Sequence, residues 1–259
     1  MPIRPAATAR RTFIGIDFDP LDTNAAVEWL TQITAETAFG YVVTPNVDHI
    51  VRLEALGEKD AVGTELWRAY RGAALVLCDS RVLARLARFY GITLPLAPGS
   101  DLTVRLFAEV AQPGDRIAII GGDAPLLQAL QARFPAFGFV QHIPPMGMLR
   151  NPAALDAAAA FGRDSGARFV LLAVGSPQQE LLAARIAASG DARGCGLCIG
   201  ASLDFIVGRQ RRAPRLVQRL GLEWAHRLAS QPGRLWRRYL VDGPRIFRLA
   251  HHHHRGVRR

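Results

Sequence analysis

Two groups of polar residues, each placed directly after a short apolar stretch, have the residue types that chemistry needs. Thr44–His49 (TPNVDH) follows Tyr41–Val43, and Asp79-Ser80 follows Ala73–Cys78. The β-branched and aromatic composition of the apolar stretches predicts buried strands. Ligands of open parallel sheets bind in the crevice beyond the carboxyl ends of the strands. If these strands are parallel, both polar groups lie at one edge and form one site.

The residues around this site also predict where the neighbouring helices begin. Pro45 disfavours a helical conformation for Thr44, and Asn46 is a good cap for a helix through Ile50–Leu56. In the same way, Asp79 is expected to open a helix over Arg81–Tyr90. The two helices would then start at the edge of the sheet where the site lies.

Two further strand–turn–helix units carry glycine at the turn. Arg116–Ile120 ends in Gly121-Gly122-Asp123, and Arg168–Val174 ends in Gly175-Ser176-Pro177 before a helix over Gln178–Ala188. Glycine allows the backbone to approach a ligand closely, and a helix N-terminus favours anions. Because the G-x-G-x-x-G fingerprint is incomplete, a tight turn without a ligand is an equal alternative for Gly121-Gly122.

The order of predicted elements indicates the fold class. Apolar runs alternate with helical patterns, and Gly- or Pro-bearing loops separate them, which is typical of an α/β fold with a mostly parallel, Rossmann-like sheet flanked by helices. The remaining predicted strands are Thr12–Phe18, Phe137–His142 and Gly196–Ile199. The remaining predicted helices are Asn24–Thr37, Ala61–Tyr70, Leu102–Val110 (capped by Ser100 or Asp101), Pro125–Phe134 and Pro152–Arg163.

Three patterns resemble metal or redox motifs. Asp17-Phe18-Asp19 is a D-x-D at a strand end, which could hold a divalent cation, but Asp19–Asp22 also fits a turn that caps the next helix. Cys195 and Cys198 are spaced as C-x-x-C within a strand pattern, so buried small residues are the preferred interpretation. The run His251–His254 lies in a polar tail without a nearby carboxylate in sequence, and we interpret it as incidental.

Charge divides the chain unevenly. From Phe205 onwards there are fourteen arginines against Glu223 and Asp242, a formal balance of +12, so the preceding part carries −2 of the total of +10. We expect a flexible leader over residues 1–11, an α/β core over 12–210 and an Arg-rich helical appendage over 211–259 that contacts a membrane and completes the active site. A basic segment of this kind implies an anionic partner.

The appendage has two interpretations. Leu216, Val217, Leu220 and Trp224 recur at helical spacing after Pro214, and a second amphipathic segment follows Pro232-Gly233. Arg-rich amphipathic helices with Trp and Tyr are typical of a membrane surface. The alternative is a helical hairpin that packs on the body or on another subunit. The three cysteines favour a reducing compartment, and we expect neither a signal peptide nor a membrane span.

In order and spacing, these blocks resemble the WecG/TagA/CpsF glycosyltransferase family from about Thr12 to about Arg248. Thr44–His49 looks like the family's first signature, and Leu75–Asp79 looks like the strand that ends in its catalytic aspartate. The other matching blocks are Gly99–Leu102, Gly121-Gly122, Gly175–Glu180, Gly200–Phe205, Arg212–Pro214, Leu220–Trp224 and Leu235–Tyr239. Two departures are Ser80, where the family commonly has Gly, and a longer stretch between the first two blocks.

The resemblance implies an inverting, metal-independent transferase that needs no cofactor. It would move a sugar from a UDP-sugar to a polyprenyl-diphosphate-linked saccharide at the inner face of the cytoplasmic membrane. Asp79 is the implied general base and Thr44 a substrate-positioning hydroxyl. The implied substrate-binding residues are Asn46, His49, Ser100, Asp101, Gly121, Gly122, Gly175, Ser176, Gln178, Gln179, Glu180, Asp204, Arg212 and Arg215.

Several questions stay open at this point. The sugar can be N-acetylmannosamine, its uronic acid or glucose, and the acceptor sugar and a possible homo-oligomer are not fixed. Two other functions are alternatives: another nucleotide-dependent Rossmann-like enzyme, such as an oxidoreductase, or an anionic-polymer-binding protein that uses the Arg tail. Nucleic acid is not an expected partner, because no recognition motif accompanies the arginines.

Overall fold

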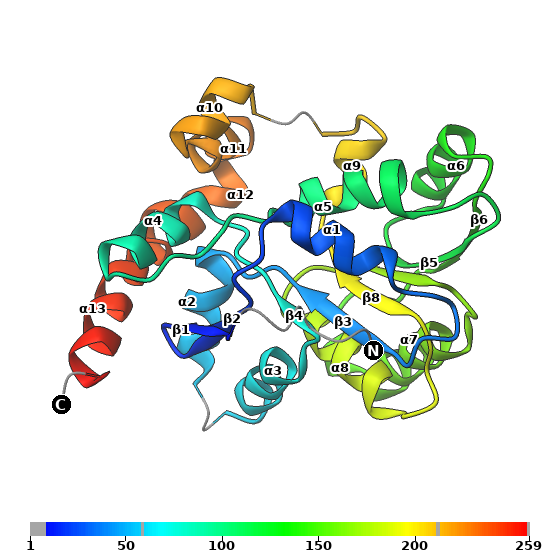
Figure 1. The fold of residues 1–259 in the computed structure, drawn as a ribbon, viewed down its shortest axis with the longest axis horizontal. Coiled ribbons are helices and arrows are strands. Elements are labelled where there is room, and N and C mark those ends of the chain that lie inside the picture. Colours follow the sequence, from blue (N-terminus) through cyan, green and yellow to red (C-terminus); the bar gives the residue numbers. More distant parts are fainter. Residues whose placement is uncertain (1–8, 58–59, 211–212, 258–259) are drawn as a thin grey trace.

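A six-stranded, wholly parallel sheet forms the centre of the molecule in the computed structural model, which describes residues 9–57, 60–210 and 213–257. The strand order is β4-β3-β8-β7-β5-β6. The strands are β3 (Gly40–Val43), β4 (Leu75–Val76), β5 (Arg116–Gly121), β6 (Gly138–His142), β7 (Phe169–Ala173) and β8 (Cys195–Cys198). The predicted α/β class with a parallel sheet is confirmed (Figure 1).

Helices cover both faces of the sheet, which explains why the strands are continuous apolar runs rather than alternating ones. Ile117 and Ile119 of β5 pack into one core cluster, and Ala118 and Ile120 pack into the other. The first face is covered by α1 (Thr23–Thr31), α5 (Gly99–Arg105) with its π-helical continuation η1 (Leu106–Val110), α6 (Ala124–Arg133) and α9 (Ser202–Ile206). The second is covered by α2 (Val47–Leu56), α3 (Ala61–Gly72), α4 (Arg81–Phe89), α7 (Pro152–Asp164) and α8 (Gln178–Ala188), with a short 3-10 turn, η2 (Met148–Arg150), before α7.

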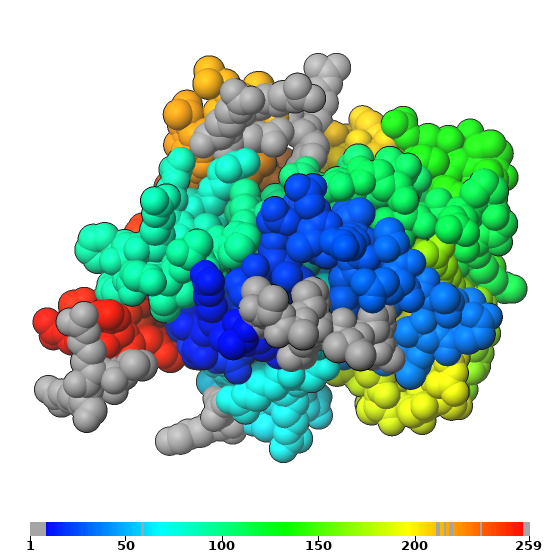
Figure 2. Space-filling view, in the orientation of Figure 1, coloured from blue at the N-terminus to red at the C-terminus, as the bar shows by residue number. Residues whose placement is uncertain are grey.

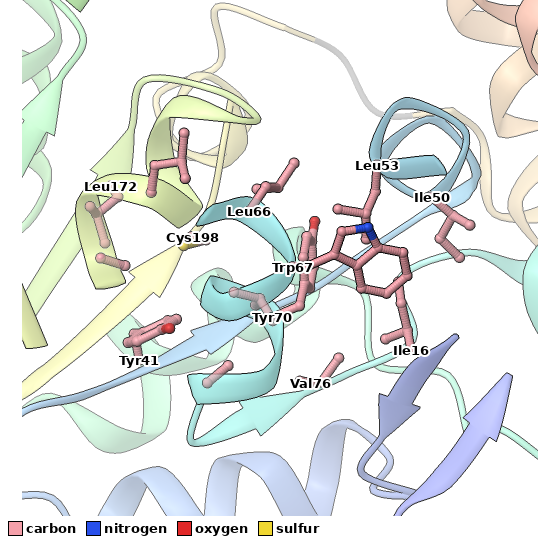
Figure 3. Close-up of a cluster of buried hydrophobic side chains, with 14 of the residues drawn as sticks. Ile16, Tyr41, Ile50, Leu53, Leu66, Trp67, Tyr70, Val76, Leu172 and Cys198 are labelled. Carbon is pink, nitrogen blue, oxygen red and sulfur yellow. The ribbon is translucent and has the colours of Figure 1, made fainter. Parts of the chain in front are cut away.

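Aromatic residues of α3 fill the second core. Figure 3 shows Trp67 and Tyr70 between the side chains of α2 and the strands, with Tyr41 beside them. The hydroxyl of Tyr41 donates to the backbone oxygen of Ala69 at 2.6 Å, so this polar atom is satisfied within the core. The packing fixes α2 against the sheet, and α2 carries part of the site at its first turn.

The N-terminal segment differs from its prediction. Instead of one strand over Thr12–Phe18, the chain forms an antiparallel hairpin of β1 (Arg11–Phe13) and β2 (Ile16–Phe18). The turn consists of Ile14 and Gly15, with φ of 48° and 71°. Two consecutive residues with positive φ match the twist of a two-residue hairpin. Arg11 is therefore part of a strand, although the prediction placed it in a flexible leader, and residues 1–8 lie outside the described part of the chain.

Two helix boundaries also differ from prediction. Helix α1 ends at Thr31 rather than at Thr37, because the hydroxyl of Thr37 accepts from the backbone N–H of Thr34 at 2.8 Å and favours a turn there. Helix α5 begins at Gly99 behind Pro98 and has no side-chain cap, so neither Ser100 nor Asp101 caps it. By contrast, Asp22 caps α1 as expected, accepting from Ala25 N–H at 2.9 Å.

The Arg-rich C-terminal part is helical. It comprises α10 (Arg215–Leu220), α11 (Glu223–Ser230), α12 (Pro232–Trp236), the π-helical η3 (Arg237–Asp242) and α13 (Arg245–Val257). Ile246 and Ala250 of α13 are buried in the second core cluster, so this helix is docked on the body. Figure 2 shows α4 between the α10–α11 pair and the exposed end of α13. Within the described residues, no helix is long and apolar enough to span a membrane.

Candidate active site

Asp79 follows β4 at the carboxyl edge of the sheet, and its carboxylate is held on both sides. Its Oδ1 accepts from the backbone N–H of Gly99 at 2.9 Å, and its Oδ2 accepts from Nδ2 of Asn46 at 3.3 Å. The backbone N–H of Asp79 donates to the oxygen of Pro45 at 3.2 Å. Residues from two segments that are distant in sequence, Pro45-Asn46 and Gly99, thus fix the orientation of one carboxylate.

The carboxylate is available for this role because neighbouring residues cap the helices. Ser80, not Asp79, caps α4 by accepting from Leu83 N–H at 3.3 Å. Asn46 caps α2 through its Oδ1, which accepts from Asp48 N–H at 3.0 Å, and this confirms the predicted cap. The side-chain amide of Asn46 therefore has two roles: its oxygen caps α2, and its nitrogen donates a hydrogen bond to Asp79.

Burial raises the pKa of Asp79 to about 6, although hydrogen bonds from Gly99 and Asn46 and the charge of Arg227 act in the opposite direction. A carboxylate with such a pKa is ionised at neutral pH and is still a stronger base than a solvated aspartate. The environment thus suits general-base chemistry better than a merely structural ion pair.

Thr44 and Gly99 are in direct contact beside this carboxylate. A Cβ atom at Gly99 would lie 2.6 Å from Oγ1 of Thr44, closer than non-bonded atoms approach, so this position has space only for glycine. Thr44 is itself buried, with 8% of its surface exposed. The contact explains how the loop before α5 can bring the Gly99 N–H to Asp79.

A polar cavity of about 710 Å³ extends from this point along the carboxyl edge of the sheet. Most of the residues predicted for the site line it: Thr44, Asn46, His49, Asp79, Ser100, Gly122, Gly175, Gln179 and Asp204. They come from the loops after β3, β4, β5 and β7 and from α2, α5, α8 and α9. The volume is typical of a small-molecule site.

Other predicted residues support the cavity without lining it. Gly121, with φ of 108°, allows close approach of β5 to β7, since a Cβ there would lie 2.7 Å from the oxygen of Ala173. The oxygen of Ser176 accepts from Arg52, and Nε2 of Gln178 donates to the oxygen of Val174 at 3.4 Å. Asp101 lies in the first turn of α5, Arg215 begins α10, and Arg212 lies outside the described residues.

Glu180 acts on the site through Gln179. Nε2 of Gln179 donates to Oε1 of Glu180 at 2.9 Å, while Oε1 of Gln179 accepts from Gly200 N–H at 3.0 Å. Both side chains are buried, and burial raises the pKa of Glu180. The pair orients the Gln179 amide in the cavity wall and joins the loops after β7 and β8.

His49 is a neutral imidazole at this site. Burial, together with the nearby charges of Arg238 and Arg52, lowers its pKa to about 3. Its Nδ1 is buried and has no hydrogen-bond partner within the described residues. His49 is therefore unsuited to be a cationic group at neutral pH, and Asp79 is the stronger candidate for the base.

The appendage contributes residues to the cavity that the sequence did not identify. Arg227, Arg238 and Tyr239 line it, and Nη2 of Arg238 lies 3.3 Å from Oδ2 of Asp48 in the first turn of α2. Oδ2 of Asp48 also pairs with Nη2 of Arg52 at 3.0 Å. The sequence predicted that arginines of the appendage complete the site but not which ones, because their position depends on how the appendage folds back over the sheet edge.

A second, mainly apolar cavity of about 520 Å³ adjoins the first on the side of the appendage. Asn46, Asp79, Arg227 and Arg238 line both cavities. Asp79 thus stands where a polar space and an apolar space meet. An arrangement of this kind can bring two different substrates to one base.

The metal-like and redox-like motifs have structural roles. Asp19 is buried and accepts from Nε and Nη2 of Arg10 at 3.1 and 3.0 Å, so the D-x-D interpretation has a structural alternative in this ion pair. Cys195 and Cys198 are buried, unbridged and in different core clusters, as predicted. Among the described residues, no three His, Cys, Asp or Glu side chains are grouped as metal ligands.

The interpretation of His251–His254 needs a correction. A carboxylate does lie nearby in space, since Nε2 of His253 is 3.2 Å from Oε1 of Glu54 on α2. The ring of His254 packs on Tyr90, with centroids 4.7 Å apart. This contact could not be predicted, because the two residues are 199 positions apart in the sequence. The histidines help to dock α13 on the body.

Fold and site together define an α/β protein of Rossmann-like class with a buried carboxylate at the carboxyl edge of a parallel sheet and a basic helical cover. The family model described as the glycosyl transferase WecG/TagA/CpsF family matches residues 11–259. The chain therefore belongs to the WecG/TagA/CpsF glycosyltransferase family, which confirms the resemblance seen in its sequence blocks. The family implies a glycosyltransferase that moves a sugar from a nucleotide-sugar donor to an acceptor.

Proposed function

We propose that the protein is an inverting hexosyltransferase that moves a sugar from a UDP-sugar to a polyprenyl-diphosphate-linked saccharide. The polar cavity takes the nucleotide sugar. The transferred sugar is N-acetylmannosamine, its uronic acid or glucose, and a panel of UDP-sugars read by UDP release would select among them. The product would serve in the synthesis of a cell-surface polysaccharide.

Asp79 is the general base of this reaction. Its carboxylate takes the proton of an acceptor hydroxyl while that oxygen forms a bond to the anomeric carbon of the donor sugar. The bond from this carbon to the diphosphate breaks on the opposite face, and UDP leaves with the electron pair. A single displacement of this kind inverts the anomeric configuration.

The departing diphosphate needs positive charge, and the appendage can provide it. Arg227 and Arg238 line both cavities next to Asp79. Guanidinium groups bind phosphate oxygens through paired hydrogen bonds, and the reaction can then proceed without a metal. Gly122 and Gly175 allow backbone N–H groups to approach the same ligand.

The position and pKa of Asp79 carry the proposal: one buried carboxylate, held by Gly99 and Asn46, at the junction of two cavities. The other interpretations, an oxidoreductase or an anionic-polymer-binding protein, give no role to this junction. The enzyme would work at the inner face of the cytoplasmic membrane, bound there by its basic appendage.

The test is Asp79→Asn. Loss of a general base typically lowers the rate about 10²–10⁴-fold, so kcat should fall by this factor while the affinity for the UDP-sugar changes little. Asp191→Asn is the matched control, because Asp191 is exposed and lies before the amino end of β8. An Asp79→Asn variant that retains most of its kcat would show that the base is another residue.

A further inference from the structure

The proposed binding of a nucleotide sugar in the polar cavity leaves the apolar cavity without an assigned ligand. It lies between the first turns of α2 and α4 and the appendage, and Val82, Trp224, Leu240 and Ile246 are among its lining residues. The polar cavity, by contrast, is lined by glycines, hydroxyls and amides from the sheet edge. The two spaces therefore suit ligands of different chemistry.

Three of the six charged residues that line the apolar cavity also line the polar cavity and so lie at its inner end. Arg227 and Arg238 line it where it meets the polar cavity at Asp79, and Arg81 of α4 lines it as well. Asp48 is paired with Arg52 and Arg238, and Glu223 is the other carboxylate near Asp79. A ligand with an anionic head next to Asp79 and an apolar remainder would match this distribution.

The surface at the outer end of the cavity is apolar too. Leu240 and Phe247 both line the cavity and are 55% and 56% exposed. Further exposed apolar side chains of the appendage include Leu216, Leu222 and Trp236. A hydrocarbon chain that leaves the cavity would thus continue along an apolar surface rather than into water.

We propose that the apolar cavity binds the isoprenoid chain of the acceptor next to its diphosphate, and that it selects acceptors by their lipid. This inference rests on the proposed function for the identity of the acceptor. The diphosphate lies by Arg227 and Arg238, the acceptor sugar reaches Asp79, and the first part of the chain fills the cavity under Leu240 and Phe247. The appendage is then a lipid-binding element of the active site as well as a membrane contact.

The first experiment compares acceptors that share one saccharide diphosphate but carry a methyl group, a geranyl chain or a farnesyl chain, in solution without vesicles. Burying several methylene groups should lower the acceptor KM by at least about tenfold from methyl to geranyl, with little change in kcat. In Leu240→Glu the acceptor KM should no longer fall from methyl to geranyl, while turnover of the methyl acceptor is retained.

Val241→Glu is the matched control, because Val241 is adjacent and 44% exposed but does not line either cavity. It should keep the preference for longer chains. Equal KM values for all three acceptors, or equal losses in the two variants, would overturn the lipid site and leave the proposed transfer reaction intact.

A binding measurement covers the case in which no acceptor is turned over, which would contradict the proposed function itself. Farnesyl diphosphate should quench the fluorescence of Trp224 in a saturable way, and the effect should be lost in Trp224→Phe and weakened in Leu240→Glu. Saturable quenching without turnover would keep the lipid site and reject the reaction. Absence of quenching in the unaltered protein would reject the site.

Discussion

At the scale of single residues, the site depends on one carboxylate that does not cap a helix. Asp79 could have capped α4, but Ser80 does so, and the carboxylate instead accepts from Gly99 and Asn46. The hydrogen bonds and burial set both the direction and the basicity of the carboxylate.

The pH dependence of turnover should report this basicity. Because burial raises the pKa of Asp79 to about 6, the ionised base is lost as the pH falls through this value. The value of kcat/KM should therefore rise with pH, reach half of its maximum near pH 6 and stay level above pH 7. A profile that is flat down to pH 5 would contradict the assignment of Asp79.

Gly99→Ala should damage the site by steric conflict alone. The added Cβ would meet Oγ1 of Thr44 at 2.6 Å, so the loop must move and the Gly99 N–H moves away from Asp79. We expect a loss of about 1–3 kcal/mol in the free energy of unfolding. Misplacement of the base should lower kcat by roughly 10- to 100-fold.

Gly233→Ala is the control for this variant. Gly233 lies in α12, and a Cβ there would have open space around it. Urea unfolding of this variant should show unchanged or slightly higher stability, because alanine favours the helix. If both variants retain full activity, the contact between Gly99 and Thr44 is not part of the catalytic geometry.

At the scale of elements, Arg10 and Asp19 form an ion pair at the base of the hairpin of β1 and β2, and hydrogen bonds of both residues attach the hairpin to the edge of the sheet. Nη2 of Arg10 donates to Oδ2 of Asp19 at 3.0 Å and to the oxygen of Ala73 at 2.8 Å, just before β4. Oδ2 of Asp19 also accepts from Val76 N–H within β4 at 2.8 Å. The hairpin thus covers the edge strand of the sheet, which would otherwise expose unpaired backbone groups.

Arg10→Ala should therefore destabilise the fold without touching the cavities. Removing one partner of a buried ion pair leaves the other charge uncompensated, and the free energy of unfolding should fall by about 3 kcal/mol. Arg163→Ala is the control, because Arg163 pairs with Asp164 on the surface. Its free energy of unfolding should change little. Equal stability of the two variants in urea would show that Arg10 does not attach the hairpin.

At the scale of the whole molecule, the basic appendage packs against the nearly neutral body. Ile246 and Ala250 are buried in the body, and Arg238 pairs with Asp48 on α2. A chain cut after residue 212 would expose the surface that α13 covers, so full-length variants are the better probes of the appendage. The division into a core over 12–210 and an appendage stays a prediction.

Membrane binding should depend on the apolar side chains that the appendage leaves exposed. Leu216 and Trp236 are 68% and 51% exposed and line neither cavity. Replacing both by Asp should lower binding to anionic vesicles by at least about tenfold in a sedimentation assay, since apolar contact and charge attraction are both weakened.

Val62→Asp with Val104→Asp is the matched control, because both valines are exposed on the body, at 39% and 42%. Its vesicle binding should stay close to that of the unaltered protein. If the two double variants lose binding equally, general charge is responsible; if neither loses it, the appendage does not contact the membrane through these helices.

The elements that depend on local pattern can be predicted from the amino-acid sequence. Continuous apolar runs predict strands buried on both faces, and capping residues such as Asn46 predict where helices start, because these effects act within a few residues. The parallel sheet then places the ends of its strands at one edge, so the polar cavity follows from Thr44, Asp79 and the glycine turns. The family resemblance rests on the same short blocks.

Contacts between groups that are distant in sequence could not be predicted in this way. Gly99 donates to Asp79 over 20 residues, Arg238 reaches Asp48, and His253 reaches Glu54 over 199 residues. Such contacts have no periodicity in the sequence, since they depend on how loops and the appendage pack after the sheet has formed. For the same reason the hairpin at Ile14-Gly15 was missed, and the apolar cavity beside Asp79 became visible only in the folded molecule.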